Sequence, residues 1–246
     1  MPQYDEIGTG YARHRRDDPR LAAPLHVALA DAKRVLNVGA GSGSYEPTDR
    51  RVVALEPSSV MIRQRRAGLA PVIQGHAESM PLATDSFDAV MTVLSAHHWS
   101  DRQAGFAELR RVAQRRVVLT FDPEVQSRMW LMDYLPEIRD LRSASGLTIE
   151  EVVEGVGGGT VTALPVPHDC RDGMTVAFWR RPEAYLDPEV RLGSSALREL
   201  DSVPLERGLA RLERDLRNGA WTRHYGQLLE LGEFDCGLRL VVGQGL

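Results

Sequence analysis

Short apolar runs alternate with longer segments of mixed polarity through the first half of the chain. Each run is short and rich in valine, leucine and alanine, as is typical of strands that are buried on both faces of a parallel sheet. The alternation therefore predicts a doubly wound α/β domain. The expected strands are residues 34–38, 51–56, 71–74, 87–93 and 116–121.

Helices are expected between these strands, where start signals precede segments of mixed polarity. The expected helices are residues 19–32, a helix that starts near Tyr45 or Glu46, residues 57–66 with Pro57-Ser58 at the start, and residues 101–113 capped by Asp101.

The pattern loosens after Asp122-Pro123. We expect one or two helices over residues 125–144, a short helix over 149–156, and strands at 160–166 and 236–242 on either side of a helical insertion. The whole chain, 1–246, is predicted to be one domain. Its expected parts are an N-terminal helical cap (1–32), a cofactor-binding core (33–123) and helical lid segments (124–156 and 172–232).

The composition is that of an ordinary globular protein, with 43% hydrophobic and 26% charged residues. A net charge of −4 gives no general attraction to nucleic acid or to anionic membranes, so neither partner is expected. The chain has no basic start followed by an apolar run, which favours a cytoplasmic protein. A monomer or a homodimer is expected. Cys170 and Cys236 are expected to be free thiols, and no metal site is predicted.

A glycine-rich turn, Gly-Ala-Gly-Ser-Gly at residues 39–43, follows the first strand. Glycines at such a turn permit positive φ and allow a ligand to approach the backbone closely. Glu56 follows Gly39 by 17 positions, at the end of the next strand, where a carboxylate can accept both hydroxyls of a ribose. Ser44 stands where the dinucleotide fingerprint has glycine or alanine, which disfavours an NAD-dependent oxidoreductase.

Four motifs in this order resemble those of class I S-adenosylmethionine-dependent methyltransferases, in the small-molecule branch that includes ubiquinone and menaquinone methyltransferases. They are VLNVGAGSG at 35–43, LEPS at 55–58, HAESMPL at 76–82 and SFDAV at 86–90. The resemblance implies a Rossmann-like seven-stranded sheet whose last strand is antiparallel, with helices on both faces and a helical lid. It also implies S-adenosyl-L-methionine as cofactor and S-adenosyl-L-homocysteine as product.

The resemblance assigns cofactor-binding positions residue by residue. The glycines are expected beneath the methionyl part, Glu56 at the ribose hydroxyls, and Met61, Ala77 and Glu78 around the adenine. The full set of expected cofactor-binding residues is Tyr11, Asn37, Gly39, Ala40, Gly41, Gly43, Glu56, Pro57, Met61, Ala77, Glu78 and Leu94.

Asn37 departs from the family pattern, which commonly has an acidic residue at the end of the first strand. An asparagine can still form hydrogen bonds but carries no charge. Two outcomes are open at this point, either weaker cofactor binding or a contact that is retained through water.

His97 and His98 follow the fourth strand, at the edge of the sheet where the methyl donor is expected. A histidine here can remove a proton from the acceptor, since its ordinary pKa lies near neutrality. The alternative is a structural role in the loop. Aromatic residues in the later segments, Trp130, Trp179 and Trp221 among them, form either an acceptor pocket or the core of the insertion itself.

The function expected from the sequence is methyl transfer from S-adenosylmethionine to oxygen, nitrogen or carbon of a small organic molecule by direct displacement. The alternative is a non-catalytic or regulatory protein that keeps the fold and binds the cofactor or its product. Asn37 and the uncertain role of the histidines motivate that alternative.

Overall fold

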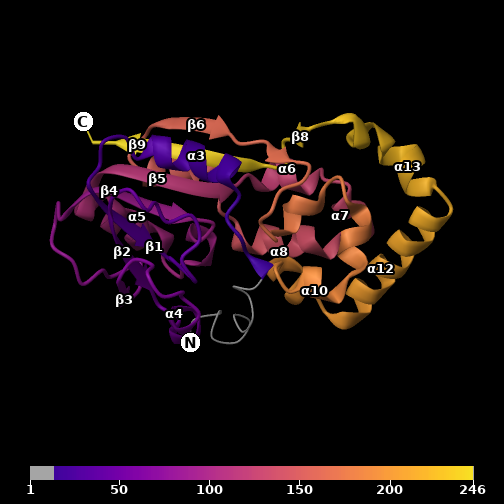
Figure 1. Cartoon of the computed structure of the whole chain (residues 1–246), viewed down its shortest axis with the longest axis horizontal. Helices are drawn as coiled ribbons and strands as arrows, with labels where there is room; N and C mark the ends of the chain where they lie inside the picture. The colour runs from indigo at the N-terminus through magenta and orange to yellow at the C-terminus, as the bar shows by residue number, and fades with distance from the viewer. Residues whose placement is uncertain (1–13, 246) are drawn as a thin grey trace.

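A seven-stranded sheet forms the centre of the computed structural model, which describes residues 14–245. The strand order is β3-β2-β1-β4-β5-β9-β6, and β9 runs antiparallel to both of its neighbours (Figure 1). The order confirms the predicted Rossmann-like sheet with an antiparallel last strand. The strands are β1 (Arg34–Val38), β2 (Arg51–Glu56), β3 (Val72–Gln74), β4 (Phe87–Val93), β5 (Ala113–Phe121), β6 (Thr160–Ala163) and β9 (Leu238–Gln244).

Alternate residues of the central strands serve two separate cores, because successive side chains of a strand point to opposite faces of the sheet. Val35 and Val117 pack in the core that includes α3 (Pro19–Ala28). Their neighbours Leu36 and Val118 pack against α5 (Arg102–Val112) and α9 (Ile149–Gly155). The sheet is therefore covered by helices on both faces, as the apolar runs predict.

Polar caps fix the starts of the helices around the sheet. Asp101 accepts a hydrogen bond from the backbone N–H of Ala104 (3.0 Å) and begins α5. Ser58 accepts from the N–H of Met61 (3.2 Å) and begins α4 (Ser59–Arg63). Both predicted helix starts are confirmed, since each cap satisfies an N–H that the first turn leaves without a partner.

The prediction of a helix that starts near Tyr45 or Glu46 is wrong. Residues 39–50 form turns and bends, and β2 begins directly after them. Tyr45 has a φ of +62°, a left-handed conformation that does not continue into a helix, and Pro47 disfavours helical geometry at Glu46. Contacts other than those of a following helix therefore hold the glycine turn in place.

The sixth strand is shorter than expected. It ends at Ala163, because Pro165 has no N–H to donate to the ladder. Val166–Pro167 (β7) pairs instead with Glu233–Phe234 (β8) in a small two-stranded sheet.

The later helices form a lobe beside the sheet (Figure 1). We define the helical lobe as the helices α6–α8 and α10–α13 together with the 3₁₀ turns η2, η3 and η4. Its elements are α6 (Pro123–Ser127), α7 (Leu131–Tyr134), α8 (Glu137–Ser145), η2 (Thr175–Phe178), η3 (Pro182–Leu186), α10 (Pro188–Arg191), α11 (Ser195–Arg198), α12 (Ser202–Arg217), α13 (Ala220–Tyr225) and η4 (Gly226–Glu230). Among residues 14–245, the structure contains no helix that is both long and apolar enough to cross a membrane.

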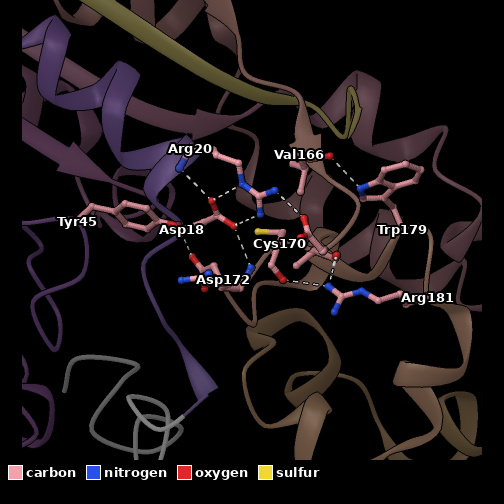
Figure 2. A network of polar contacts seen from close by, with 11 residues as sticks. Asp18, Arg20, Tyr45, Val166, Cys170, Asp172, Trp179 and Arg181 are labelled. Carbon is pink, nitrogen blue, oxygen red and sulfur yellow. Dashed lines mark hydrogen bonds and ion pairs between the residues drawn. The ribbon is translucent and has the colours of Figure 1, made fainter. Parts of the chain in front are cut away.

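Aromatic side chains build the core of the helical lobe. The Trp130 ring meets those of Tyr185 and Trp221 edge to face, with centroids 5.5 and 5.4 Å apart. Trp130 Nε1 donates to the carbonyl of Trp179 (2.7 Å), and Trp179 Nε1 donates to that of Val166 (3.0 Å; Figure 2). These aromatics are expected from the sequence to form either an acceptor pocket or the core of the insertion. The structure places them in the core of the lobe.

A polar network around Asp18 ties the start of α3 to the segment that leads into the helical lobe (Figure 2). Asp18 is fully buried and caps α3 by accepting from the N–H of Arg20 (3.0 Å). It also accepts from the N–H of Arg171 (3.0 Å) and from the Arg20 guanidinium (2.9 and 2.8 Å). Arg20 continues to the exposed Asp169 (2.6 Å). One carboxylate thus joins two parts of the chain that are far apart in sequence.

We predict that Asp18→Asn lowers the free energy of unfolding by about 1–3 kcal/mol at pH 7, because it weakens hydrogen bonds to a buried charged group. The hydrogen bonds from Arg20 hold the pKa of Asp18 well below its ordinary value. Its stabilisation is therefore complete above the ordinary pKa and is lost as the pH falls toward the lowered one. Urea unfolding at pH 7 and at pH 3 should show a smaller difference between wild type and variant in acid.

Asp169→Asn is the matched control, because Asp169 binds the same arginine at an exposed position. We expect a loss below about 1 kcal/mol for this surface pair. Equal losses for the two variants would contradict the role assigned to Asp18.

Candidate functional site

A cavity of about 610 Å³ opens at the carboxyl ends of β1, β2 and β4, the edge of an open α/β sheet where ligands bind. Its lining comes mostly from the segments that follow these strands and β3. The lining residues are Arg15, Asn37, Gly39, Ala40, Gly41, Ser42, Ser44, Glu56, Pro57, Met61, His76, Ala77, Glu78, Val93, Leu94, Ser95, His98, Trp99 and Ser100.

The glycine turn forms one wall of the cavity. Gly39, Gly41 and Gly43 have φ values of +65°, +53° and +97°, a region that favours glycine. A Cβ added at Gly39 would lie 1.7 Å from Ser95 Oγ, and one added at Gly43 would lie 2.6 Å from a methyl carbon of Leu69. Both the backbone conformation and the close packing therefore require glycine here.

Glu56 connects the glycine turn to the start of α4. Its carboxylate accepts from the N–H of Gly41 (2.8 Å) and from the N–H of Ser58 (2.9 Å). The side chain is buried yet lies in the cavity wall. Glu56 thus fixes the turn against the start of α4 and places a carboxylate, a group that only accepts hydrogen bonds, in the cavity wall.

Glu78 connects the segment after β3 to the segment after β4. Its Oε1 accepts from the backbone N–H and the hydroxyl of Ser100, both at 2.8 Å. Burial raises the pKa of Glu78, but hydrogen bonds from backbone groups and from Ser100 outweigh it, so the pKa lies below the ordinary value. A carboxylate at this position therefore holds the loop that carries the histidines.

The two histidines differ in position. They lie in a 3₁₀ turn, η1 (Ala96–His98), which starts two residues after Leu94, a non-glycine residue with a φ of +52°. Of the two, His98 belongs to the cavity lining and His97 does not. Their rings are 4.0 Å apart between centroids. This placement makes His98 the histidine that can meet a ligand.

Asn37 is a buried polar residue of the cavity lining. Its side chain is 1% exposed, and its Nδ2 donates to Glu46 Oε1 (3.2 Å). Among the described residues, Asn37 Oδ1 has no hydrogen-bond partner, although buried polar groups rarely remain without one.

Most of the residues expected from the sequence meet in this one cavity. Outside its lining lie Gly43 and His97, whereas Tyr11 falls outside the described residues. Arg15 belongs to the lining and is paired with Asp172. No residue of 124–232, within the described part of the chain, lines the cavity, so the lid role of the helical segments stays a prediction.

Sequence reasoning missed several lining residues next to those it named. His76 precedes Ala77 in the same motif, and Trp99 and Ser100 extend the histidine segment. Their place at the carboxyl edge of the sheet was the signal that could have identified them.

Comparison with known proteins places the chain in a family. Residues 36–121 match the family described as "Methyltransferase domain". A solved structure from Anabaena variabilis, a candidate methyltransferase from an antibiotic biosynthesis pathway, is 32% identical with a TM-score of 0.86, over 92% of this chain and 97% of that one.

Curated relatives cover less of the chain. The uncharacterised protein YafE of Escherichia coli is 49% identical over 46% of this chain and 58% of its own length. The ubiquinone/menaquinone biosynthesis C-methyltransferase UbiE of Syntrophotalea carbinolica is 31% identical over 42% of this chain and 49% of its own. The chain spans about half the length of the curated relatives it matches. It belongs to the class I S-adenosylmethionine-dependent methyltransferases.

We predict that Gly39→Ala lowers the free energy of unfolding by about 3 kcal/mol or more, because a clash with Ser95 adds to backbone strain. Gly68→Ala is the matched control, since Gly68 also has a positive φ (+88°) but no atom within 4 Å of an added Cβ. It should lose only about 1–2 kcal/mol, the cost of the left-handed conformation. Chemical unfolding measures both, and equal losses would contradict the close-packing role of Gly39.

Proposed function

We propose that the protein transfers a methyl group from S-adenosylmethionine to oxygen, nitrogen or carbon of a small organic molecule. The observation that carries the proposal is the single cavity that combines the glycine turn, Glu56 and His98. Family membership supports the same reaction.

The residues present fit this cofactor. The turn at Gly39–Gly43 offers backbone without side chains, and Glu56 offers a carboxylate for ribose hydroxyls. The unsatisfied Asn37 Oδ1 is an acceptor suited to the α-ammonium group of the cofactor. Pro57, Met61 and Ala77 provide apolar surface suited to the adenine.

The protein's contribution to the reaction is mainly positioning. Bound S-adenosylmethionine supplies a methyl group already activated as a sulfonium, so displacement needs chiefly an in-line approach. Orientation of two reactants can supply about 7–11 kcal/mol, whereas a general base typically adds a factor of about 10²–10⁴. His98 is the proposed base, because it is the member of the histidine pair in the cavity wall.

The charges around the cavity disfavour an anionic acceptor. The lining carries the carboxylates of Glu56 and Glu78, while the cationic Arg15 is already paired with Asp172. An acceptor that brought a carboxylate or phosphate would meet like charges. We therefore infer an acceptor without a negative charge near the reacting atom.

Calorimetric titration tests the cofactor. We expect micromolar binding of S-adenosylmethionine and S-adenosylhomocysteine, and at least about tenfold weaker binding by Glu56→Gln, which loses a charged acceptor. Glu150→Gln, at an exposed position on α9, is the control and should bind like wild type. NAD should give no heat. Absence of S-adenosylmethionine binding by folded protein would refute the proposal.

A panel of uncharged and anionic acceptors with labelled S-adenosylmethionine tests the base. We expect His98→Gln to lower kcat by about 10²–10⁴-fold with unchanged S-adenosylhomocysteine affinity. His97→Gln should retain most activity, because His97 is outside the cavity wall. Equal loss in both variants would favour a structural role for the loop, and inactivity with every acceptor would favour the non-catalytic alternative.

A further inference from the structure

A buried ion pair lies behind the glycine turn. The Arg65 guanidinium contacts both carboxylate oxygens of Glu46, at 2.8 and 2.9 Å. The two side chains are only 5% and 3% exposed. Burying two charges is costly unless their remaining hydrogen-bonding groups are also satisfied, so such a pair calls for a specific reason.

The ion pair also forms hydrogen bonds with two backbone segments, one at Gly41 and one at Ala70. Arg65 donates to the carbonyls of Ala70 (3.0 Å) and Gly41 (3.4 Å), and the N–H of Ala70 donates to Glu46 Oε2 (3.3 Å). A Cβ at Gly43 would lie 3.2 Å from Arg65 Nη1. The guanidinium therefore lies directly against the glycine turn, in a chain where no helix follows that turn within residues 44–50.

Glu46 also determines which way the Asn37 amide faces. A carboxylate only accepts hydrogen bonds, so Asn37 must present its NH₂ group to Glu46 Oε1, 3.2 Å away. The amide oxygen then has to face away from Glu46. This oxygen is the buried acceptor without a partner among the described residues.

We propose that Glu46 and Arg65 are positioning residues for the cofactor, an inference that rests on the proposed function. Arg65 holds the glycine turn through Gly41, and Glu46 holds Asn37 so that its Oδ1 accepts from the ammonium group of the cofactor. Where the family commonly has an acidic residue at position 37, this chain has a carboxylate one hydrogen bond away, at Glu46, and Arg65 balances its charge. Asn37 is thus a matched part of this arrangement, and an acidic residue in its place would oppose Glu46.

Asn37→Asp is the decisive variant, because it introduces an acidic residue, as is common in the family. An aspartate would place a second carboxylate about 3 Å from Glu46, and like charges at this separation repel. We expect the affinity for S-adenosylhomocysteine, measured by calorimetry, to fall about tenfold or more. The exchange variant Asn37→Asp/Glu46→Gln has one carboxylate and one amide again and should recover most of this loss.

Arg65→Gln tests the other partner, with Arg63→Gln as its matched control. Arg63 is an exposed arginine two positions earlier, bonded to Ser59 Oγ (3.1 Å). We expect about tenfold weaker binding for the first and a change below about twofold for the second. Should Arg65→Gln not fold, Arg65→Lys carries the same expectation, since an ammonium cannot reproduce the planar, multiply bonded contact.

The outcomes separate this inference from the proposed function. A wild-type protein that binds neither S-adenosylmethionine nor S-adenosylhomocysteine would refute the proposed function itself. If the wild type binds and folded Asn37→Asp binds equally or more tightly, the positioning role of Glu46 is refuted while the function stands. Circular dichroism and thermal unfolding of each variant establish that the affinities refer to folded protein.

Discussion

The close approach of the backbone at Gly39 to Ser95 is the constraint on which the site depends. β1 and β4 are parallel neighbours, and the chain leaves both at the same edge of the sheet. A Cβ at Gly39 would overlap the Ser95 side chain, so the turn can lie against the segment after β4 only because position 39 has no side chain. The segment that carries His98 and the turn that carries the glycines consequently share one cavity. Sheet topology alone would bring the two strand ends near each other, but this contact brings their loops together.

A turn with three glycines of positive φ has high conformational entropy when unfolded, and here no helix within residues 44–50 anchors its far end. Tyr45 provides anchoring instead. Its N–H donates to Asp17 (2.8 Å), its hydroxyl donates to Asp172 (2.8 Å), and its carbonyl lies 3.0 Å from His26 Nε2. The ring is almost fully buried between these segments (Figure 2). The cofactor turn is therefore joined to the N-terminal segment, to α3 and to the segment that leads into the helical lobe.

The parts of the fold that could be predicted from the sequence are those with local causes. Buried strands appear as short apolar runs, and caps such as Ser58 and Asp101 act within three residues. The helix expected after the glycine turn does not form, because Pro47 disfavours helical geometry at Glu46 and β2 begins only a few residues later, at Arg51. The choice between His97 and His98 could not be made from the sequence, since it depends on how one 3₁₀ turn is oriented.

Asn37 shows why a single position is an unsafe basis for judging a binding site. Considered alone, it is a lost charge, which leaves either weaker cofactor binding or a contact retained through water. In the structure its amide contacts Glu46, which is paired with Arg65 from a loop 19 residues farther along the chain. No periodicity or motif connects these three residues, because their contact depends on the shape of two irregular loops. The electrostatic unit is the group of three side chains, and its net charge is zero whether or not residue 37 is counted. An acidic residue at position 37 would make that unit negative in a buried place, so the asparagine is the residue that this particular loop geometry requires.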